Sequence, residues 1–335
     1  MKHRVGFVGL ESNEEKYFSN KLPTDEFELL FYSDTANLDS ALDVLSIPAM
    51  TPIGEELLQK LPRLKLIACR STGVDHIDAA AVKKRQITVT NTPSYGSSSV
   101  AEYTFALILS LSRKLPEVLY ETYSGEPNRQ RERGFDLFGK TIGIIGLGNI
   151  GKGVAQIAYG IGMRIIAYDR NHDEKLASWL KIEYVDDVDY LLRESDIVTL
   201  HIPYTPENQH FIDIEKLNLM KKSAILINTA RGDLVDTVAL ARALGRGEIY
   251  GAALDVVEDE YLLDPDDLLE LAASQDRAAK NTIRHALALL SLERLPNVIV
   301  TNHNAYNTTE AIERINQMTV DNIVGFYHGD KIYLV

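Results

Sequence analysis

The sequence predicts an α/β fold with parallel sheets, and three observations support this prediction. Short apolar runs that suit buried strands alternate with amphipathic stretches along the whole chain. One of these runs leads directly into a glycine-rich turn. The chain has 335 residues, which is too long for one ordinary core and suits two domains of common size.

Strands and helices can be assigned in order along the chain. The first part predicts three strands and two helices, the strands at 4–8, 65–69 and 87–90 and the helices at 14–21 and 54–60. A long apolar helix is expected over 98–115, with three serines that can cap its start and Pro116 to interrupt or kink it. The second part predicts six buried strands with helices between them, at 141–146, 164–168, 196–201, 224–228, 250–255 and 297–301. This alternation indicates a parallel sheet covered on both faces.

The composition is that of a globular protein, with 45% hydrophobic and 25% charged residues. A net charge of −13 argues against nucleic-acid binding, and the one basic cluster, residues 129–133, is typical of a solvated or interdomain surface. No apolar run approaches the roughly 20 residues of a membrane helix. Cys69 is the single cysteine and cannot form an internal disulfide, which indicates a reducing cytoplasm. We expect no metal site.

The strongest local motif is the glycine turn at residues 146–151, which follows an apolar strand and opens an amphipathic stretch. Gly146 permits the tight turn, Gly148 lets the backbone approach a pyrophosphate, and Gly151 lets helix and strand pack closely. Phosphates then lie at a helix N-terminus, where N–H groups and the dipole favour negative charge. The motif alone is a weak signal, but its strand–turn–helix context predicts a dinucleotide site.

An acidic residue, Asp169, follows the next predicted strand. It lies at about the distance expected for the carboxylate that accepts hydrogen bonds from a ribose 2′-hydroxyl. A carboxylate there repels a 2′-phosphate and therefore favours NAD over NADP. Arg170 leaves the strictness of this preference open, because an arginine at this strand end can accommodate the phosphate.

Two further residues follow predicted strands, where open α/β sheets bind ligands. Arg231 comes after the strand 224–228, and its planar guanidinium can bind a substrate carboxylate in bidentate fashion. His303 comes after the strand 297–301 and is the natural acid or base near neutral pH. Among the other histidines only His201 shares a strand-end position, and it more plausibly lines the cofactor crevice.

A carboxylate hydrogen-bonded to such an imidazole would orient it and raise its pKa, which suits a proton donor. The candidates form the acidic run Glu258, Asp259 and Glu260. Spacing alone does not choose among these three residues. Together with the dinucleotide site, these groups suit hydride transfer between a nicotinamide cofactor and a small 2-keto acid.

The chain resembles the D-isomer-specific 2-hydroxyacid dehydrogenases over nearly its whole length. The segments that carry the resemblance are 70–78, 146–151, 228–232, 253–260 and 301–306. The family implies an NAD-dependent oxidoreductase with two domains. A flavodoxin-like substrate-binding domain would comprise residues 1–97 and 304–335, and a Rossmann-type NAD-binding domain would be inserted between them as residues 98–303.

The resemblance also assigns site residues. Family enzymes use an Arg–Glu–His triad, which selects Glu260 beside Arg231 and His303. Backbone N–H groups of Thr72 and Gly73 are implied to meet the substrate carboxylate, and Asp255 to orient the nicotinamide amide. Cofactor contacts are further implied for Gly146, Gly148, Asn149, Ile150, Gly151, Asp169, Ile202, Pro203, Asn208, Thr229, Ala230 and Arg231.

Two residues depart from the family pattern, and one segment has an unusual length. Asn302 stands where a proline usually precedes the catalytic histidine, and Asn304 replaces a common Ile or Thr. Loss of a proline frees one φ angle, so we expect the placement of His303 to be less rigid and the substrate geometry altered. The segment 261–296 is unusually long, is expected to be largely helical, and either covers the cleft entrance or, as we favour, decorates the surface.

Tyr95 and Tyr306 fall where D-lactate-type members place aromatic residues near the substrate side chain. This favours reduction of pyruvate or a related small keto acid to the D-hydroxy acid. Glyoxylate, hydroxypyruvate and 3-phosphoglycerate remain alternative substrates, and an NAD-sensing corepressor on the same scaffold is the non-enzymatic alternative. Formate oxidation is disfavoured, because formate enzymes have Gln at the position of Glu260. The family commonly forms homodimers through the NAD-binding domain, for which the stretch 100–111 with the arm through Arg133 is a candidate surface.

Overall fold

The computed structural model describes every residue except 1, 50, 126–129, 131–132, 260–270, 272 and 274–275. The chain divides into two compact units. We call residues 1–95 with 307–335 the terminal unit and residues 96–306 the central unit. The central unit was expected to comprise residues 98–303. No helix of the described residues is both long and apolar enough to cross a membrane.

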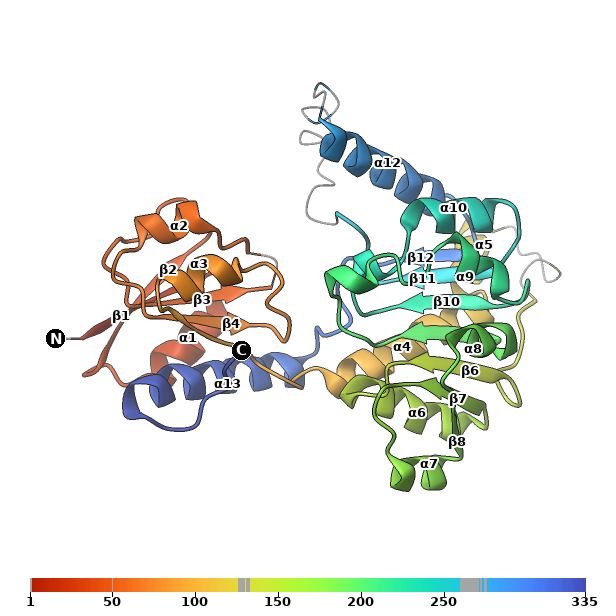
Figure 1. Ribbon diagram of the computed structural model, residues 1–335, viewed down its shortest axis with the longest axis horizontal. Coiled ribbons are helices and arrows are strands. Elements are labelled where there is room, and N and C mark those ends of the chain that lie inside the picture. The colour runs from red at the N-terminus through yellow and green to blue at the C-terminus, as the bar shows by residue number, and fades with distance from the viewer. Residues whose placement is uncertain are drawn as a thin grey trace. The chain divides into compact units, whose positions relative to one another are not determined.

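The terminal unit contains a five-stranded parallel sheet in the order β2-β1-β3-β4-β5 (Figure 1). Its strands are β1 (His3–Val8), β2 (Phe27–Tyr32), β3 (Val44–Pro48), β4 (Leu66–Arg70) and β5 (Thr88–Thr90). Its helices are α1 (Ser12–Lys21), α2 (Glu55–Lys60), α3 (Ala79–Lys84) and α13 (Thr309–His328). Strands β1, β4 and β5 match the predicted runs, whereas β2 and β3 were not predicted.

Helix α13 brings the end of the chain back to the terminal unit, where it packs against β4 and α1. Its buried Asn322 donates from Nδ2 to the carbonyl of Asn91 (2.8 Å) and accepts from the backbone N–H of Tyr333 at Oδ1 (3.0 Å). Val320 and Ile323 add to the core around Phe7 and Phe18. The terminal unit is therefore built from two segments far apart in the sequence.

The central unit contains a seven-stranded parallel sheet in the order β12-β11-β10-β9-β6-β7-β8. Its strands are β6 (Thr141–Ile145), β7 (Arg164–Tyr168), β8 (Ile182–Tyr184), β9 (Ile197–Leu200), β10 (Ile225–Asn228), β11 (Gly251–Leu254) and β12 (Val298–Val300). All six predicted strands are found, and only the short edge strand β8 was not predicted. The chain moves outward from β6 to β8 and then returns to β9 on the other side, so the strand order reverses between β6 and β9. This reversal point is where doubly wound sheets bind ligands.

Helices cover both faces of this sheet. One core cluster joins α4 (Ser97–Ser112) and α6 (Asn149–Ile161) to the sheet through residues such as Phe105 and Val154. The other joins α8 (Val188–Glu194), α9 (Ile214–Leu219) and α10 (Thr237–Gly245) through Leu191, Leu217 and Leu240. The remaining helices are α5 (Leu115–Ser124), α7 (Glu174–Leu180) and α12 (Arg277–Leu292), with short 3-10 turns at Pro206–Asn208 and Gly232–Leu234.

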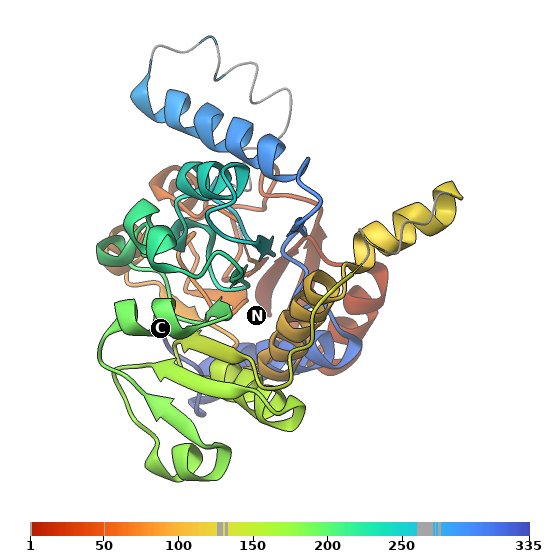
Figure 2. The same cartoon turned by 90° about the vertical axis from the view of Figure 1, so that its right-hand side faces the viewer.

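The long helix expected over 98–115 is interrupted, as predicted, but the break comes before Pro116. Helix α4 ends at Ser112, Lys114 adopts a left-handed conformation (φ 51°), and α5 begins at Leu115. The expected serine cap was wrong, because the serines lie inside the first turn and the N-cap residue is Gly96, which has no side chain. Figure 2 shows α5 extending away from the rest of the central unit.

Within the segment 261–296, residues 277–292 form α12, as the helical prediction required. The helix packs along α10 and places Leu292 in the core. This part of the segment therefore contributes to the packing of the central unit and is more than a surface decoration. Residues 261–270 lie outside the described part of the chain.

Candidate active site

The glycine turn joins β6 to α6 at the carboxyl edge of the central sheet. Gly146 has φ 95°, and a Cβ there would lie 2.6 Å from the carbonyl oxygen of His201. A Cβ on Gly151 would lie 2.1 Å from the carbonyl oxygen of Gly146. Around Gly148, in contrast, no described atom lies within 4 Å of a built Cβ. Two glycines are thus required by packing, and the third leaves open space at the start of α6, which suits a pyrophosphate.

Asp169 follows β7 directly and lies beside this turn. Its Oδ2 accepts a hydrogen bond from the N–H of Leu147 (2.6 Å), and Oδ1 accepts one from the N–H of Asn171 (2.8 Å). Each carboxylate oxygen keeps further acceptor capacity for a ribose hydroxyl. The residues around the turn therefore fit an adenine dinucleotide. The neighbouring Arg170 is exposed.

The loop after β9 faces the same reversal point in the sheet. Asn208 donates from Nδ2 to the carbonyl of Pro203 (2.9 Å) and accepts from the N–H of Thr205 at Oδ1 (2.7 Å). These two hydrogen bonds of the Asn208 side chain stabilise the loop that carries Ile202 and Pro203. The cofactor contacts assigned to these three residues by resemblance stay predictions.

His201, at the end of β9, cannot serve as the proton donor near neutral pH. Burial of the imidazole lowers its pKa to about 3, so the ring is neutral. Its Nε2 lies 2.9 Å from Thr199 Oγ1, and Nδ1 has no partner among the described residues.

The turn that carries Arg231 is fixed by the fully buried Asn228 at the end of β10. Asn228 Oδ1 accepts from the N–H of Ala230 (3.0 Å), and Nδ2 donates to the carbonyl of Arg231 (2.8 Å). Thr229 is also buried, with its Oγ1 3.0 Å from Oγ1 of Thr104 in α4. The sequence prediction identified Arg231 and missed Asn228, whose role depends on these contacts.

Gly232 brings this turn against the segment that follows β11. A Cβ on Gly232 would lie 2.1 Å from the carbonyl oxygen of Val257 and 2.6 Å from the nitrogen of Glu258. A glycine is therefore required by close approach of the two backbones. The turn of Arg231 therefore lies next to Val257 and Glu258.

The turn that carries His303 is fixed by Asp255, which is 1% exposed. The Asp255 carboxylate accepts from Thr301 Oγ1 (2.6 Å), from the N–H of Asn304 (2.9 Å) and from the N–H of Ala305 (2.9 Å). Its backbone carbonyl accepts from the N–H of His303 (2.8 Å). These bonds hold the turn although residue 302 is not a proline. The orienting of a nicotinamide amide by Asp255 stays a prediction.

His303 itself has a left-handed backbone conformation, φ 53°, which is uncommon for a residue with a side chain. Its ring stands edge-on to the ring of Tyr306 at a centroid distance of 6.4 Å. Tyr306 was predicted to lie near the substrate, and its contact with substrate stays a prediction. Tyr95 belongs to the terminal unit, and its backbone carbonyl accepts from Arg314 Nε (2.7 Å).

The acidic run separates into residues with different partners. Glu258 is buried and accepts from the N–H of Thr237 (2.9 Å), and its Oε1 lies 2.6 Å from His210 Nε2. Asp259 pairs with His285 Nδ1 at 2.8 Å, and this hydrogen bond lowers the pKa of Asp259 and raises that of His285. Glu258 and Asp259 are thus committed to other histidines. Glu260, the residue selected by resemblance, lies outside the described residues.

His210 and His285 do not follow predicted strands, so the sequence does not single them out as site residues. The structure instead pairs each of them with a carboxylate of the acidic run. No sequence signal marks these pairs, because their members are separated by 48 and 26 residues.

In the terminal unit, Thr72 and Gly73 follow β4 in a tight turn. Thr72 Oγ1 donates to the carbonyl of Thr92 (3.0 Å), and Ser71 Oγ donates to the carbonyl of Gly73 (2.7 Å). The buried Arg70 braces the strand end by donating to Ser46 Oγ (3.0 Å) and to the carbonyl of Val8 (2.5 Å). The turn is therefore well defined, and its contact with substrate stays a prediction.

Comparison with known proteins gives consistent matches. A family profile described as "D-isomer specific 2-hydroxyacid dehydrogenase, NAD binding domain" matches residues 105–305. A D-3-phosphoglycerate dehydrogenase of Methanocaldococcus jannaschii is 43% identical over 218 residues, 65% of this chain and 42% of that protein. A glyoxylate reductase of Korarchaeum cryptofilum is 36% identical over 283 residues, 83% of this chain and 78% of that protein.

The fold agrees with a solved structure of D-lactate dehydrogenase from Aquifex aeolicus complexed with NAD and lactic acid. The TM-score is 0.84 at 37% sequence identity, covering 97% of this chain and 96% of that one. These matches agree with the structure. It has two parallel sheets, a glycine turn with an adjacent carboxylate, and turns at strand ends that carry Arg231 and His303. The chain belongs to the D-isomer-specific 2-hydroxyacid dehydrogenases, the family of NAD-dependent oxidoreductases that its sequence resembles.

Proposed function

We propose that the chain reduces a small, unphosphorylated 2-keto acid, pyruvate or one of similar size, to the D-2-hydroxy acid. The observation that carries the proposal is a pair of turns at the carboxyl edge of the central sheet, after β10 and β12, on either side of the segment that follows β11. Asn228 fixes the turn of Arg231, and Asp255 fixes the turn of His303. Both turns contact the chain segment that leads into Glu260. The Arg231 turn does so through Gly232, and the His303 turn does so through its hydrogen bonds to Asp255.

Each residue then has one role. Arg231 binds the substrate carboxylate and polarises the adjacent carbonyl. NADH, when bound at the glycine turn, supplies the hydride that C2 of the keto acid accepts. His303 gives a proton to the carbonyl oxygen as negative charge develops there, and Glu260 orients the imidazole. Thr72 and Gly73 of the terminal unit, which we propose to be the substrate-binding domain, add backbone N–H groups for the carboxylate.

The substrate choice rests on Tyr306, whose ring lies against His303, and on the position of Tyr95. Aromatic rings suit a small or moderately apolar side chain and provide no cation for a phosphate. The D-lactate dehydrogenase of Aquifex aeolicus supports this choice. The glyoxylate reductase relative favours glyoxylate or hydroxypyruvate as the second candidate.

The test is a comparison of kcat/KM for pyruvate, 2-ketoisocaproate, glyoxylate, hydroxypyruvate and 3-phosphohydroxypyruvate, followed by NADH absorbance at 340 nm. We expect the highest value for one of the unphosphorylated acids, with pyruvate first. A strong preference for the phosphorylated acid would refute the substrate choice. No turnover of any acid would instead favour an NAD-sensing binding protein. Repeating the assay with NADPH measures how far Arg170 relaxes the preference for NADH.

We further propose that the chain works in the cytoplasm as a homodimer. Cys69 is buried, which agrees with a reducing compartment.

In the stretch 100–111, Phe105 and Ile108 are buried in the central unit's own core, so α5 offers the better dimer surface. None of the residues of α5, all of which are described, is buried, and Tyr120 and Tyr123 are 74% and 87% exposed. Light scattering should report twice the chain mass, and Tyr120→Asp combined with Tyr123→Asp should shift it toward a monomer.

A further inference from the structure

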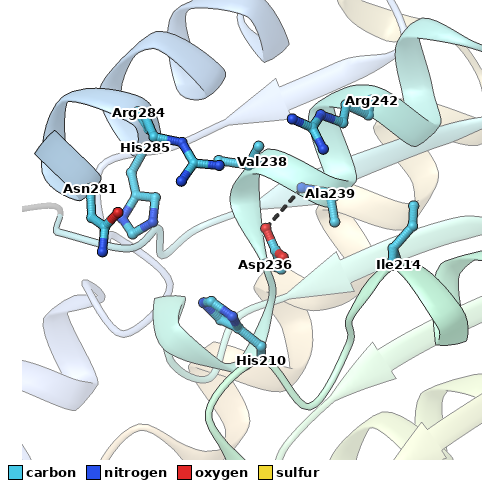
Figure 3. A pocket seen from close by; sticks show the side chains of 9 residues that line it. All are labelled: His210, Ile214, Asp236, Val238, Ala239, Arg242, Asn281, Arg284 and His285. Carbon is cyan, nitrogen blue, oxygen red and sulfur yellow. Dashed lines mark hydrogen bonds between the residues drawn. The ribbon is translucent and has the colours of Figure 1, made fainter.

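A cavity of about 270 Å³ lies between α10 and α12 in the central unit. Figure 3 shows Asn281, Arg284 and His285 of α12 on one side and Arg242 of α10 on the other, with Asp236 and His210 below them. The cavity is separate in composition from the proposed reaction site, because neither Arg231 nor His303 lines it. Nothing in the proposed dehydrogenase chemistry uses its residues.

The two arginines of this cavity have no hydrogen-bond or ion-pair partner in the described part of the chain, and the same holds for the amide of Asn281. The carboxylate of Asp236 is the acidic group of the lining, and it is engaged in accepting from the N–H of Ala239 (2.8 Å) at the start of α10. Both histidines already have carboxylate partners outside the lining, Glu258 and Asp259. Arg242 and Arg284 thus give the lining two guanidinium groups against the single carboxylate of Asp236.

The two guanidinium groups lie on α10 and α12, which pack together, and both groups are exposed. Guanidinium groups bind carboxylates and phosphates in bidentate fashion, and an amide and imidazoles add further donors. A cavity of this size is below the range of about 300–1,000 Å³ typical of drug-sized ligands, so it suits a smaller molecule.

We propose that this cavity binds a small multivalent oxyanion, of the size of a tricarboxylate or a phosphorylated acid, clamped by Arg242 and Arg284. The bound anion ties α12 to α10. Because His285 and His210 pair with Asp259 and Glu258, the same clamp restrains the acidic run that leads to Glu260. The site is thus an effector site beside the reaction site, and this proposal goes beyond the dehydrogenase activity.

The test is isothermal titration of the full chain, without cofactor, using citrate and inorganic phosphate as probes. Saturable binding of at least one probe is expected, and Arg242→Gln and Arg284→Gln should each weaken it about tenfold, the loss expected for one charge-assisted hydrogen bond. Arg277→Gln is the matched control, because Arg277 is an exposed arginine of the same helix that does not line the cavity. It should leave the affinity unchanged.

Three results would overturn the proposal. The first is the absence of saturable binding of either probe to the wild-type chain. The second is equal weakening by Arg277→Gln, which would indicate diffuse charge attraction. The third is loss of binding in Arg231→Gln with retention in both cavity variants, which would place the anion in the proposed reaction site. Both cavity arginines are exposed, so the variants should fold, and a thermal unfolding curve of each checks this. Hydrogen exchange supplies a second measurement, since the anion should slow exchange in α12.

Discussion

The turns of Arg231 and His303 and the cavity between α10 and α12 belong to the same unit but are held in different ways. The turns are fixed by two buried residues, Asn228 and Asp255, whose side chains bond backbone groups. The cavity is bordered by exposed arginine side chains and by histidine–carboxylate pairs. Groups proposed to act in the reaction are therefore positioned by the protein alone, as catalysis requires. The cavity arginines have no such partner among the described residues, and in the proposal a bound anion supplies it.

Replacement of His303 should have the largest effect on turnover. His303→Ala removes the proposed proton donor, and general acid catalysis of this kind contributes about 10² to 10⁴ in rate. We expect kcat to fall by about this factor while NADH affinity, measured by fluorescence titration, stays near the wild-type value. His328→Ala is the control, because this histidine pairs with Glu26 in the terminal unit. Unchanged turnover in His303→Ala would remove the residue from the mechanism.

Replacement of Gly232 should disturb the contact between two turns rather than a reacting group. In Gly232→Ala the new Cβ meets the carbonyl of Val257, so the backbones must separate. We expect a loss of about 1–3 kcal/mol in the free energy of unfolding and of about 10² in kcat/KM. Gly160→Ala, where the described residues leave open space, should keep both values. A fully active Gly232→Ala enzyme would show that the spacing of these turns is unimportant.

Asp255→Asn tests the anchor of the His303 turn. Both carboxylate oxygens of Asp255 accept hydrogen bonds, and the substitution turns one of them into an NH₂ group. This NH₂ group cannot accept, so one of the N–H or O–H donors of the turn loses its partner. Leaving a buried group unsatisfied costs about 1–3 kcal/mol, which should appear in chemical denaturation. Because the turn loosens, kcat should fall as well, by about tenfold for each 1.4 kcal/mol lost in the transition state. If stability falls and kcat does not, the turn is not what positions His303.

The pair of His285 and Asp259 should give the smallest effect, and one that depends on pH. The pKa of His285 is raised from 6.5, so its contribution to stability is present below about that pH and lost as pH rises through the raised value. The pKa of Asp259 is lowered from 3.8, so its contribution is present above that pH and lost as pH falls through the lowered value. Stabilisation is greatest between these limits and is about 0–1 kcal/mol for a partly exposed pair. Unfolding curves of His285→Asn and wild type should therefore differ near pH 5, and the difference should shrink as pH rises through the raised pKa of His285.

Strands buried on both faces could be predicted from the sequence, because their apolar runs are continuous. All six strands predicted in the second part of the chain are present. The edge strands β2 and β8 could not be recognised, since β2 is half-exposed and β8 has only three residues. β3 contains a buried, mainly apolar run, Val44 to Ile47. The sequence therefore carried a signal for this strand, and the prediction missed it.

The site was predictable where chemistry follows a strand end, as for Arg231 and His303. The residues that hold these turns were not predictable, because their bonds depend on how distant strands align. Asp255 bonds Thr301, Asn304 and Ala305 across 46 to 50 residues of sequence. The pair of His210 and Glu258 could not be predicted for the same reason. Nor could the cavity between α10 and α12, because it exists only once the two helices have packed together.

Helix α13 also has a consequence for biosynthesis. The chain leaves the ribosome N-terminus first, and domains generally fold as units during synthesis. The β-strands of the terminal unit emerge before the central unit, but α13, which packs against β4 and adds to their core, emerges after it. The central unit can therefore finish folding before the terminal one. Until then the nascent chain exposes an uncovered apolar sheet face, a natural binding target for a chaperone.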